Sequence, residues 1–285
     1  MGSRRHAMMA MIGMASALTG ARLHASALER LFVGKPKALE FFAPAGTATP
    51  AAAPPDHRAW QAWLDRFLVV NHPSAIHRVR YGAVDPPGRA ALAGYLRAVQ
   101  AIDPRRLARD EQLAYWINLY NAVTVQVILD HPGVRSIRDI KSGLFSVGPW
   151  QLPLARVAGQ SLSLDAIEHR IVRPLFRDRR VHFALNCASL GCPDLAARAF
   201  TGATIDADLA AAQRTFLAHP RAIRFSGESL VLSSLFDWYR EDFAADETGV
   251  IKYLAGNAAA ATAARLQAFR GTISYAYDWS LNGAP

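Results

Sequence analysis

The sequence has few cysteines and no long apolar run, and each shortage narrows the architectures that the chain can adopt. Only two of its 285 residues are cysteine, which excludes a small scaffold held together by disulfides. A chain of this length buries enough apolar surface to fold without such bridges. We find no internal repeat, and 51% of the residues are hydrophobic. We therefore expect one large globular domain, or a core domain with a helical annex.

The sequence also lacks a nucleic-acid-binding motif, although its formal net charge is +9. The arginines are dispersed, so we expect no nucleic acid partner, while an acidic partner or a membrane surface fits the positive charge. The densest basic run is "RIVRPLFRDRR" at 170–180, where apolar residues alternate with arginines. This pattern fits either a solvated face or an anion site.

The N-terminus has the organisation of an export signal over residues 1–27. Arg4 and Arg5 precede an apolar run that is too short for a stable membrane span, and Ala25–Ala27 form an A-x-A cleavage site. The paired arginines are typical of a twin-arginine signal. We expect cleavage near Ala27 and a periplasmic mature protein, in a compartment that favours disulfides.

Residues 28–58 are predicted to be an N-terminal segment with a mobile linker rich in Pro and Ala, followed by a single domain over 59–285. Apolar residues at helical spacing predict a series of helices from near Trp60 onward, the last of which is a long buried helix that begins after Arg109. Further along, turn residues predict hairpins around Gly159 and Gly227, and "RVHFALN" at 180–186 has the composition of a strand. The fold class is therefore α+β, with N-terminal helices and a long central helix packed on a small, mostly antiparallel sheet.

Five motifs in this order resemble the domain-of-unknown-function family DUF547. They are "YWINLYNAVTV" at 115–125, "LSLDAIEHRIVRP" at 162–174, "HFALNCASLGCPDL" at 182–195, "FDWYREDF" at 236–243 and "YDWSLN" at 277–282. The resemblance extends over roughly residues 60–282. In the cysteine loop, members of the family usually have Gly and Ser at the positions of Ala188 and Gly191.

The resemblance implies an uncharacterised family found in bacteria, where members are often exported, and in plants. A central helix, a small antiparallel sheet and a cysteine–histidine set are together similar to papain-like and transglutaminase-like thiol enzymes, a similarity at the level of the fold alone.

A thiol nucleophile needs a base within hydrogen-bond reach and a group that orients the base. Cys187 is the candidate nucleophile, and His182 or His169 is the candidate base. If 180–186 is a continuous strand, His182 and Cys187 point to opposite faces, unless the strand ends or bulges near Asn186. Glu168 is the candidate orienting group, and Asp194 is a further carboxylate.

Other polar residues are candidates for binding. His169 and Arg173 share a helical face because they are four residues apart. Asn118 and Asn121 lie three apart on an apolar helix and need hydrogen-bond partners, so they either anchor neighbouring structure or line a pocket. Each histidine also has a structural interpretation, as a hydrogen-bonded residue of the core or a helix edge.

Cys187 and Cys192 are open to four interpretations: a disulfide, a reactive thiol with Cys192 as its resolving partner, a metal site, or two inert core thiols. The spacing is wider than in a zinc knuckle and no second cysteine pair exists, so we expect neither a metal nor another cofactor.

The leading hypothesis is an exported thiol-dependent hydrolase or acyl transferase that acts on an amide or a peptide-like ligand. The alternative is a non-catalytic periplasmic binding module with a structural disulfide. The sequence carries no signal for a particular oligomeric state.

Overall fold

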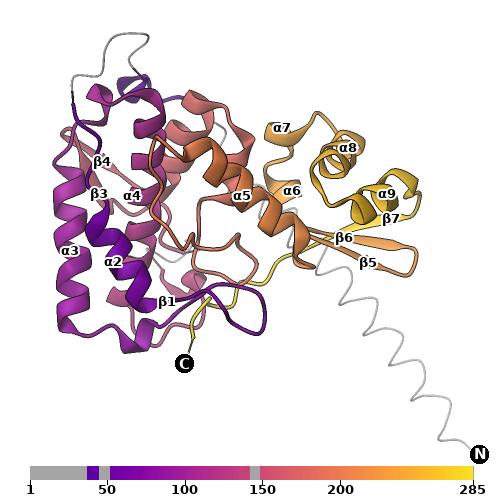
Figure 1. Cartoon of the computed structure of the whole chain (residues 1–285), viewed down its shortest axis with the longest axis horizontal. Coiled ribbons are helices and arrows are strands. Elements are labelled where there is room, and N and C mark those ends of the chain that lie inside the picture. Colours follow the sequence, from indigo (N-terminus) through magenta and orange to yellow (C-terminus); the bar gives the residue numbers. More distant parts are fainter. Residues whose placement is uncertain (1–36, 45–51, 142–147, 285) are drawn as a thin grey trace, which may run out of the picture.

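The computed structural model describes residues 37–44, 52–141 and 148–284. The predicted export signal at 1–27 and its cleavage site lie outside these residues. Figure 1 shows a larger helical part built from α2, α3 and α4, a smaller part with α6–α9 and β5–β7, and α5 running between the two.

Three helices form the larger part: α2 (Arg58–Phe67), α3 (Pro86–Gln100) and α4 (Arg109–Asp130). Asp85 caps α3 by accepting the Gly88 N–H at 2.9 Å, with Pro86 next along the chain. Helix α4 is buried around almost its whole circumference and packs against α3, α5 and the segment 166–176. The long central helix predicted from the apolar pattern is thus confirmed.

Phe42 lies in the stretch predicted as a mobile linker, yet its side chain is fully buried. Its ring packs edge-on against Trp116 with 5.0 Å between the ring centroids. The short turn Glu40–Phe42 is further held by a hydrogen bond from the Leu39 N–H to the Arg170 carbonyl. At this point the N-terminal segment is therefore part of the core.

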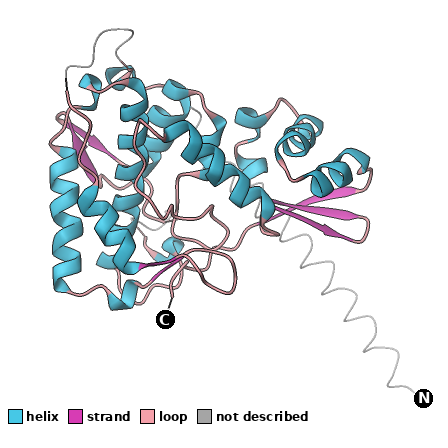
Figure 2. Cartoon of the chain, viewed as in Figure 1, coloured by secondary structure: helices cyan, strands magenta, loops and turns pink. Residues whose placement is uncertain are grey.

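The strands form small separate sheets, and the α+β class with mostly antiparallel pairing is confirmed (Figure 2). The predicted hairpins are present, with turns at Ala158–Gly159 and Gly227–Glu228. The last strand pairs with β6 in parallel. The strand bounds are β1 (Leu68–Val69), β2 (Arg78–Val79), β3 (Ala155–Val157), β4 (Gln160–Leu162), β5 (Ile223–Ser226), β6 (Ser229–Ser233) and β7 (Thr272–Ala276).

The later helices include two that the sequence pattern did not predict, α5 (Ile205–Ala218) and α9 (Ala260–Ala268). Both are rich in alanine, which gives a weak apolar periodicity despite its high helix propensity. The other α-helices in this region are α6 (Leu235–Trp238), α7 (Arg240–Phe243) and α8 (Glu247–Asn257). The short or wide helices are η1 (Glu40–Phe42), η2 (Tyr81–Ala83), η3 (Pro104–Arg106), η4 (Ile137–Asp139), η5 (Ala166–Phe176) and η6 (Arg179–Phe183).

The strand predicted over 180–186 is wrong. Residues Arg179–Phe183 form the 3₁₀-helix η6, capped by the Asp178 carboxylate, which accepts the Arg180 N–H at 2.9 Å. Residues Val181–Asn186 are all buried, and burial of consecutive residues does not separate a strand from a buried turn. The argument that His182 and Cys187 point to opposite faces of a strand therefore no longer applies.

The buried apolar residues form two clusters, one within the larger part and one between α5–α8 and the β5–β7 sheet. After β7 the chain returns to the larger part, where Leu281 bridges to Ser189 and Gly283 bridges to Val79. The C-terminal segment consequently passes directly beside the cysteine loop. Among the described residues, none of the helices is long and apolar enough to cross a membrane.

Candidate functional site

The polar candidates gather in two adjoining groups. We call the first the histidine–carboxylate network, made of Glu168, His169, Arg173, His182, Tyr239 and Asp242. We call the second the thiol cluster, made of Cys187, Ser189, Cys192 and Tyr277. Most of these residues are remote from one another in sequence, so the fold and not local structure brings them together.

Helix η5 supplies three members of the network from one wide π-helix. Such helices are rare and are often found at functional sites. Glu168, His169 and Arg173 are all less than a tenth exposed. The contact predicted from the four-residue spacing is present, since the Arg173 guanidinium donates to His169 Nδ1 at 2.9 Å.

His182 is the centre of the network. Its Nε2 lies 2.7 Å from Asp242 Oδ2, and its Nδ1 lies 3.9 Å from Glu168 Oε1. The Tyr239 ring stacks on the imidazole with 4.1 Å between centroids. Two carboxylates and an aromatic face therefore fix the orientation of His182.

The same Asp242 oxygen also accepts the Arg173 Nε–H at 2.6 Å. Burial alone would raise the pKa of Asp242, but the hydrogen bonds and charges of His182 and Arg173 hold it well below its usual range. Burial would likewise raise the pKa of Glu168, and the charges of His169 and His182 bring it below its ordinary value. Both carboxylates are thus ionised around a buried imidazole.

The two histidines differ in what surrounds them. Burial lowers the pKa of His169, and the neighbouring Arg173 guanidinium lowers it further. Because Arg173 donates to Nδ1, His169 acts as an acceptor in this network. His182 instead places its Nε2 against the Asp242 carboxylate.

In the thiol cluster, three polar groups surround the partly exposed Cys187. Cys187 Sγ lies 3.0 Å from Cys192 Sγ, 3.2 Å from Ser189 Oγ and 3.1 Å from the Tyr277 hydroxyl. The Cys187 N–H donates to Cys192 Sγ at 3.0 Å. Cys192 is buried, so Cys187 is the thiol that a reagent or substrate reaches first.

These contacts divide the two thiols electrostatically. The hydrogen bond with Cys192, together with those to Ser189 and Tyr277, lowers the pKa of Cys187, although burial alone would raise it. Burial and the neighbouring Cys187 raise the pKa of Cys192. A thiol with a lowered pKa beside a thiol with a raised pKa is the pattern of a nucleophile with a neighbouring partner thiol.

Tyr120 on α4 connects the two groups. Its hydroxyl donates to Glu168 Oε2 at 3.2 Å. Burial raises the pKa of Tyr120, and the negative charges of Glu168 and Cys187 raise it further. The network and the thiol cluster therefore influence the same buried hydroxyl, although the hydrogen bonds of Cys187 go to other groups than the histidines.

The amides of α4 anchor the backbone that carries the cysteines. Asn121 accepts the Asn186 N–H at 2.9 Å and donates to the Ala184 carbonyl at 3.0 Å. Asn118 makes the same pair of bonds to the backbone N–H and carbonyl of Phe200, at 3.0 and 2.8 Å. Of the two roles considered for these amides, these bonds favour the anchor.

Ala188 and Gly191 complete the loop geometry. Ala188 has a φ of 59°, a left-handed conformation in which glycine is unstrained. A Cβ on Gly191 would lie 2.7 Å from the Asp278 nitrogen and 2.9 Å from the Tyr277 ring. Glycine at this position therefore allows the C-terminal segment to bring Tyr277 against Cys187.

The comparisons with known proteins give one match. Residues 104–217 match the family model described as "Protein of unknown function, DUF547". This segment is a DUF547 domain. No curated protein and no solved structure matches the chain.

The DUF547 domain contains all the predicted site residues, namely Asn118, Asn121, Glu168, His169, Arg173, His182, Cys187 and Cys192. Asp194 is also within the domain. It pairs with Arg221 at 2.7 Å and accepts the His77 N–H, so its partners lie outside both the histidine–carboxylate network and the thiol cluster. Among the described residues, no group of three or more His, Cys, Asp and Glu side chains could hold a metal ion.

Sequence reasoning missed Asp242, Tyr239 and Tyr277, which follow the matched DUF547 segment. All three occur in the motifs "FDWYREDF" and "YDWSLN", so a signal was present. Their roles depend on tertiary contacts across more than fifty residues, which motif order does not reveal.

Replacing Asn121 with Ala tests the anchor directly. We expect the free energy of unfolding to fall by about 2–4 kcal/mol, because a buried N–H and a buried carbonyl lose their partners. Urea unfolding followed by circular dichroism measures the change. The control is Gln126→Ala on the same helix, whose exposed bond to Asp130 predicts a much smaller loss. Equal losses in the two variants would contradict the anchoring role.

Proposed function

We propose that the protein is a cysteine-dependent hydrolase or acyl transferase that acts on an amide or peptide-like substrate, with Cys187 as its nucleophile. The observation that carries the proposal is the set of three polar groups around Cys187 Sγ, at 3.0–3.2 Å from Cys192, Ser189 and Tyr277. The Ser189 hydroxyl donates to the Tyr277 oxygen, so the Tyr277 hydroxyl can donate its own proton to the Cys187 sulfur. Hydrogen bonds to a thiolate favour ionisation, and the thiolate is the reactive form of cysteine.

The reaction that fits this arrangement is acyl transfer in two steps. The Cys187 thiolate attacks the substrate carbonyl carbon and forms a thioester, while the amine leaves and takes up a proton. Water or a second amine then attacks the thioester and releases the thiolate. Because hydrogen bonds within the thiol cluster activate Cys187, no direct histidine contact is needed for the first attack.

His182 is the favoured proton carrier of the two histidines. It bonds to Asp242 and faces Glu168, so two carboxylates orient its imidazole for proton transfer. His169 is instead committed to the Arg173 guanidinium, so we assign it a positioning role. Substrate binding would have to bring the leaving group within reach of His182.

We also infer that the protein acts in the periplasm after removal of residues 1–27. The paired arginines, the short apolar run and the A-x-A site carry this inference. In that compartment the two thiols would meet oxidants, which makes their redox state part of the function.

Acyl trapping tests the proposed chemistry. The reduced full-length protein is mixed with p-nitrophenyl acetate, p-nitrophenol release is followed, and the acetylated residue is located by mass spectrometry. We expect a burst of p-nitrophenol and acetyl on Cys187. Cys187→Ser should abolish both, whereas Cys192→Ser should retain acylation. Equal release from Cys187→Ser, or acetyl on lysines alone, would sink the proposal.

The competing function is a binding module in which Cys187 and Cys192 form a structural disulfide. The separation of 3.0 Å between the sulfurs favours it, since a small movement would close the bond. Counting reactive thiols in protein purified without reductant distinguishes the two. Two thiols per chain support the enzyme, while none, together with an inert reduced form, supports the binding module.

A further inference from the structure

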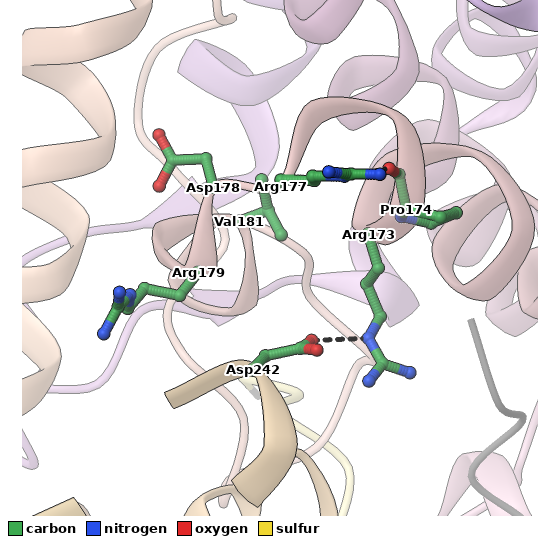
Figure 3. A pocket seen from close by; sticks show the side chains of 7 residues that line it. All are labelled: Arg173, Pro174, Arg177, Asp178, Arg179, Val181 and Asp242. Atoms are coloured by element: carbon green, nitrogen blue, oxygen red, sulfur yellow. Dashed lines mark hydrogen bonds and ion pairs between the residues drawn. The ribbon is translucent and has the colours of Figure 1, made fainter. Parts of the chain in front are cut away.

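A cavity of about 300 Å³ lies beside the histidine–carboxylate network. It forms where the end of η5, the start of η6 and helix α7 meet (Figure 3). Its volume is at the lower end of the range of small-molecule sites. The lining residues are Arg173, Pro174, Arg177, Asp178, Arg179, Val181 and Asp242.

The acidic residues of this cavity already have cationic partners. Asp178 pairs with Arg180 at 2.6 Å and also accepts its backbone N–H. Asp242 pairs with Arg173 at 2.6 Å and with His182 at 2.7 Å. Little negative charge is therefore left to neutralise the other two arginines of the lining.

Arg177 and Arg179 have no such carboxylate partner within the described part of the chain. Arg177 Nε donates to the Pro174 carbonyl at 3.3 Å, and Arg179 donates to the Phe243 carbonyl at 3.1 Å. Both side chains are exposed, and in Figure 3 they extend to opposite sides of the cavity. A bound anion could recruit the Arg177 guanidinium for the loss of one carbonyl hydrogen bond. Recruiting Arg179 would also draw it from the Tyr253 ring, over which its Cζ lies 5.3 Å from the centroid.

Arg177 is also held in an unusual conformation. It ends η5 with a φ of 55°, where helices normally place glycine or asparagine. An arginine here carries a backbone cost, yet its position puts a guanidinium at the cavity. The basic run "RIVRPLFRDRR" thus supplies three arginines to one cavity and not simply a solvated face.

We propose that this cavity binds the oxyanion group, carboxylate or phosphate, of a small molecule through Arg177 and Arg179. Guanidinium groups recognise both anions through paired N–H bonds. Pro174 and Val181 offer apolar contact to the rest of the ligand. The site is separate from Cys187 and does not rest on the thiol chemistry proposed above.

The position of the cavity connects a bound ligand to His182 through Asp242. Asp242 lines the cavity, and its Oδ2 atom bonds to His182 Nε2 as well as to Arg173. An anion beside Arg173 would compete for the charge that now stabilises Asp242. Occupancy of the cavity would therefore change the electrostatic surroundings of the Asp242–His182 pair.

Binding is tested by isothermal titration calorimetry at low ionic strength, with the full-length protein and with inorganic phosphate, succinate and citrate in separate titrations. We expect saturable binding of at least one anion at one site per chain. The double variant Arg177→Gln/Arg179→Gln should weaken it about tenfold or more, since two charge-assisted bonds are lost. Saturable binding of phosphate alone would indicate a phosphate ligand, and saturable binding of succinate and citrate alone would indicate a carboxylate ligand.

Arg270→Gln is the matched control. Arg270 is exposed and also donates only to backbone carbonyls, those of Gln267 and Phe269, but it lies outside the cavity. It should leave binding unchanged, and so should Cys187→Ser. Binding lost equally in Arg270→Gln, or no saturable binding of any of the three anions, would overturn the proposal. Since Cys187→Ser removes only the thiol, failure here and failure of the acyl-transfer proposal are distinguishable.

Discussion

Replacing Asp242 with Asn is expected to lower the free energy of unfolding by about 3–5 kcal/mol, because the change breaks a mostly buried charge network by removing one partner. The Arg173 side chain is 1% exposed and the His182 side chain is 1% exposed, so water cannot replace the lost carboxylate charge. Asn has nearly the same shape as Asp, so packing is preserved and the loss reports the charge. Urea unfolding at pH 7 measures it.

The loss of stability in Asp242→Asn should become smaller as the pH falls. The folded-state pKa of Asp242 lies below its unfolded value, so its contribution is complete above about pH 4, where both states are ionised. As the pH falls below that value, the unfolded chain takes up the proton first and the contribution shrinks. The difference between wild type and Asp242→Asn should therefore narrow in acid.

Asp206→Asn is the control for this prediction. Asp206 also pairs with an arginine, at 2.8 Å from Arg180, but its side chain is 86% exposed. Exposed pairs contribute typically about 0.2–1 kcal/mol. An equally small loss in Asp242→Asn, or a loss that grows toward low pH, would mean that the network does not hold Asp242 as described.

Oxidation of the dithiol should abolish the reactivity of Cys187 completely and reversibly. With glutathione disulfide as oxidant, Cys187 attacks one sulfur and releases the first glutathione. Cys192 then attacks the Cys187 sulfur of the mixed disulfide and displaces the second glutathione, which leaves one Cys187–Cys192 bond and two glutathione thiols. The separation of 3.0 Å between the two sulfurs places the resolving thiol next to the first adduct. Iodoacetamide labelling before and after treatment, followed by mass spectrometry, measures the change.

The Cys192→Ser variant distinguishes this closure from simple capping. Without the resolving thiol, the variant should stop at a glutathione adduct on Cys187, visible as added mass. Dithiothreitol should restore labelling in both proteins. A stable glutathione adduct on the wild-type protein, with no internal bond, would contradict the pairing of the two cysteines.

Local patterns were sufficient to predict the helical part of the fold. Helix α4 has apolar residues on every face and acids in its first turn, and these two features depend only on neighbours in sequence. The β5–β6 hairpin was likewise predictable from its Gly227 turn. Segments 180–186 and 205–218 were not, because consecutive burial and alanine-rich composition give no clear period.

The candidate site was predictable in part for the same reason. The residues of η5 and the cysteine loop lie in compact motifs, so His169 and Arg173 could be paired by spacing and Glu168 named as a candidate orienting group. Asp242 and Tyr277 reach the site only because the chain passes through the smaller part and returns. Contacts across such distances depend on tertiary packing, and strand parity gave a wrong geometry where no strand exists.

The central claim is that the hydrogen bonds around Cys187 make it a thiolate more readily than an ordinary cysteine. The most direct test is the rate of iodoacetamide reaction at Cys187 in the reduced protein, measured by mass spectrometry from pH 5 to 10, with Tyr277→Phe alongside. The account predicts a midpoint below the ordinary thiol pKa of about 8.5 and an upward shift in Tyr277→Phe. A midpoint at or above the ordinary value, unmoved by Tyr277→Phe, would contradict it.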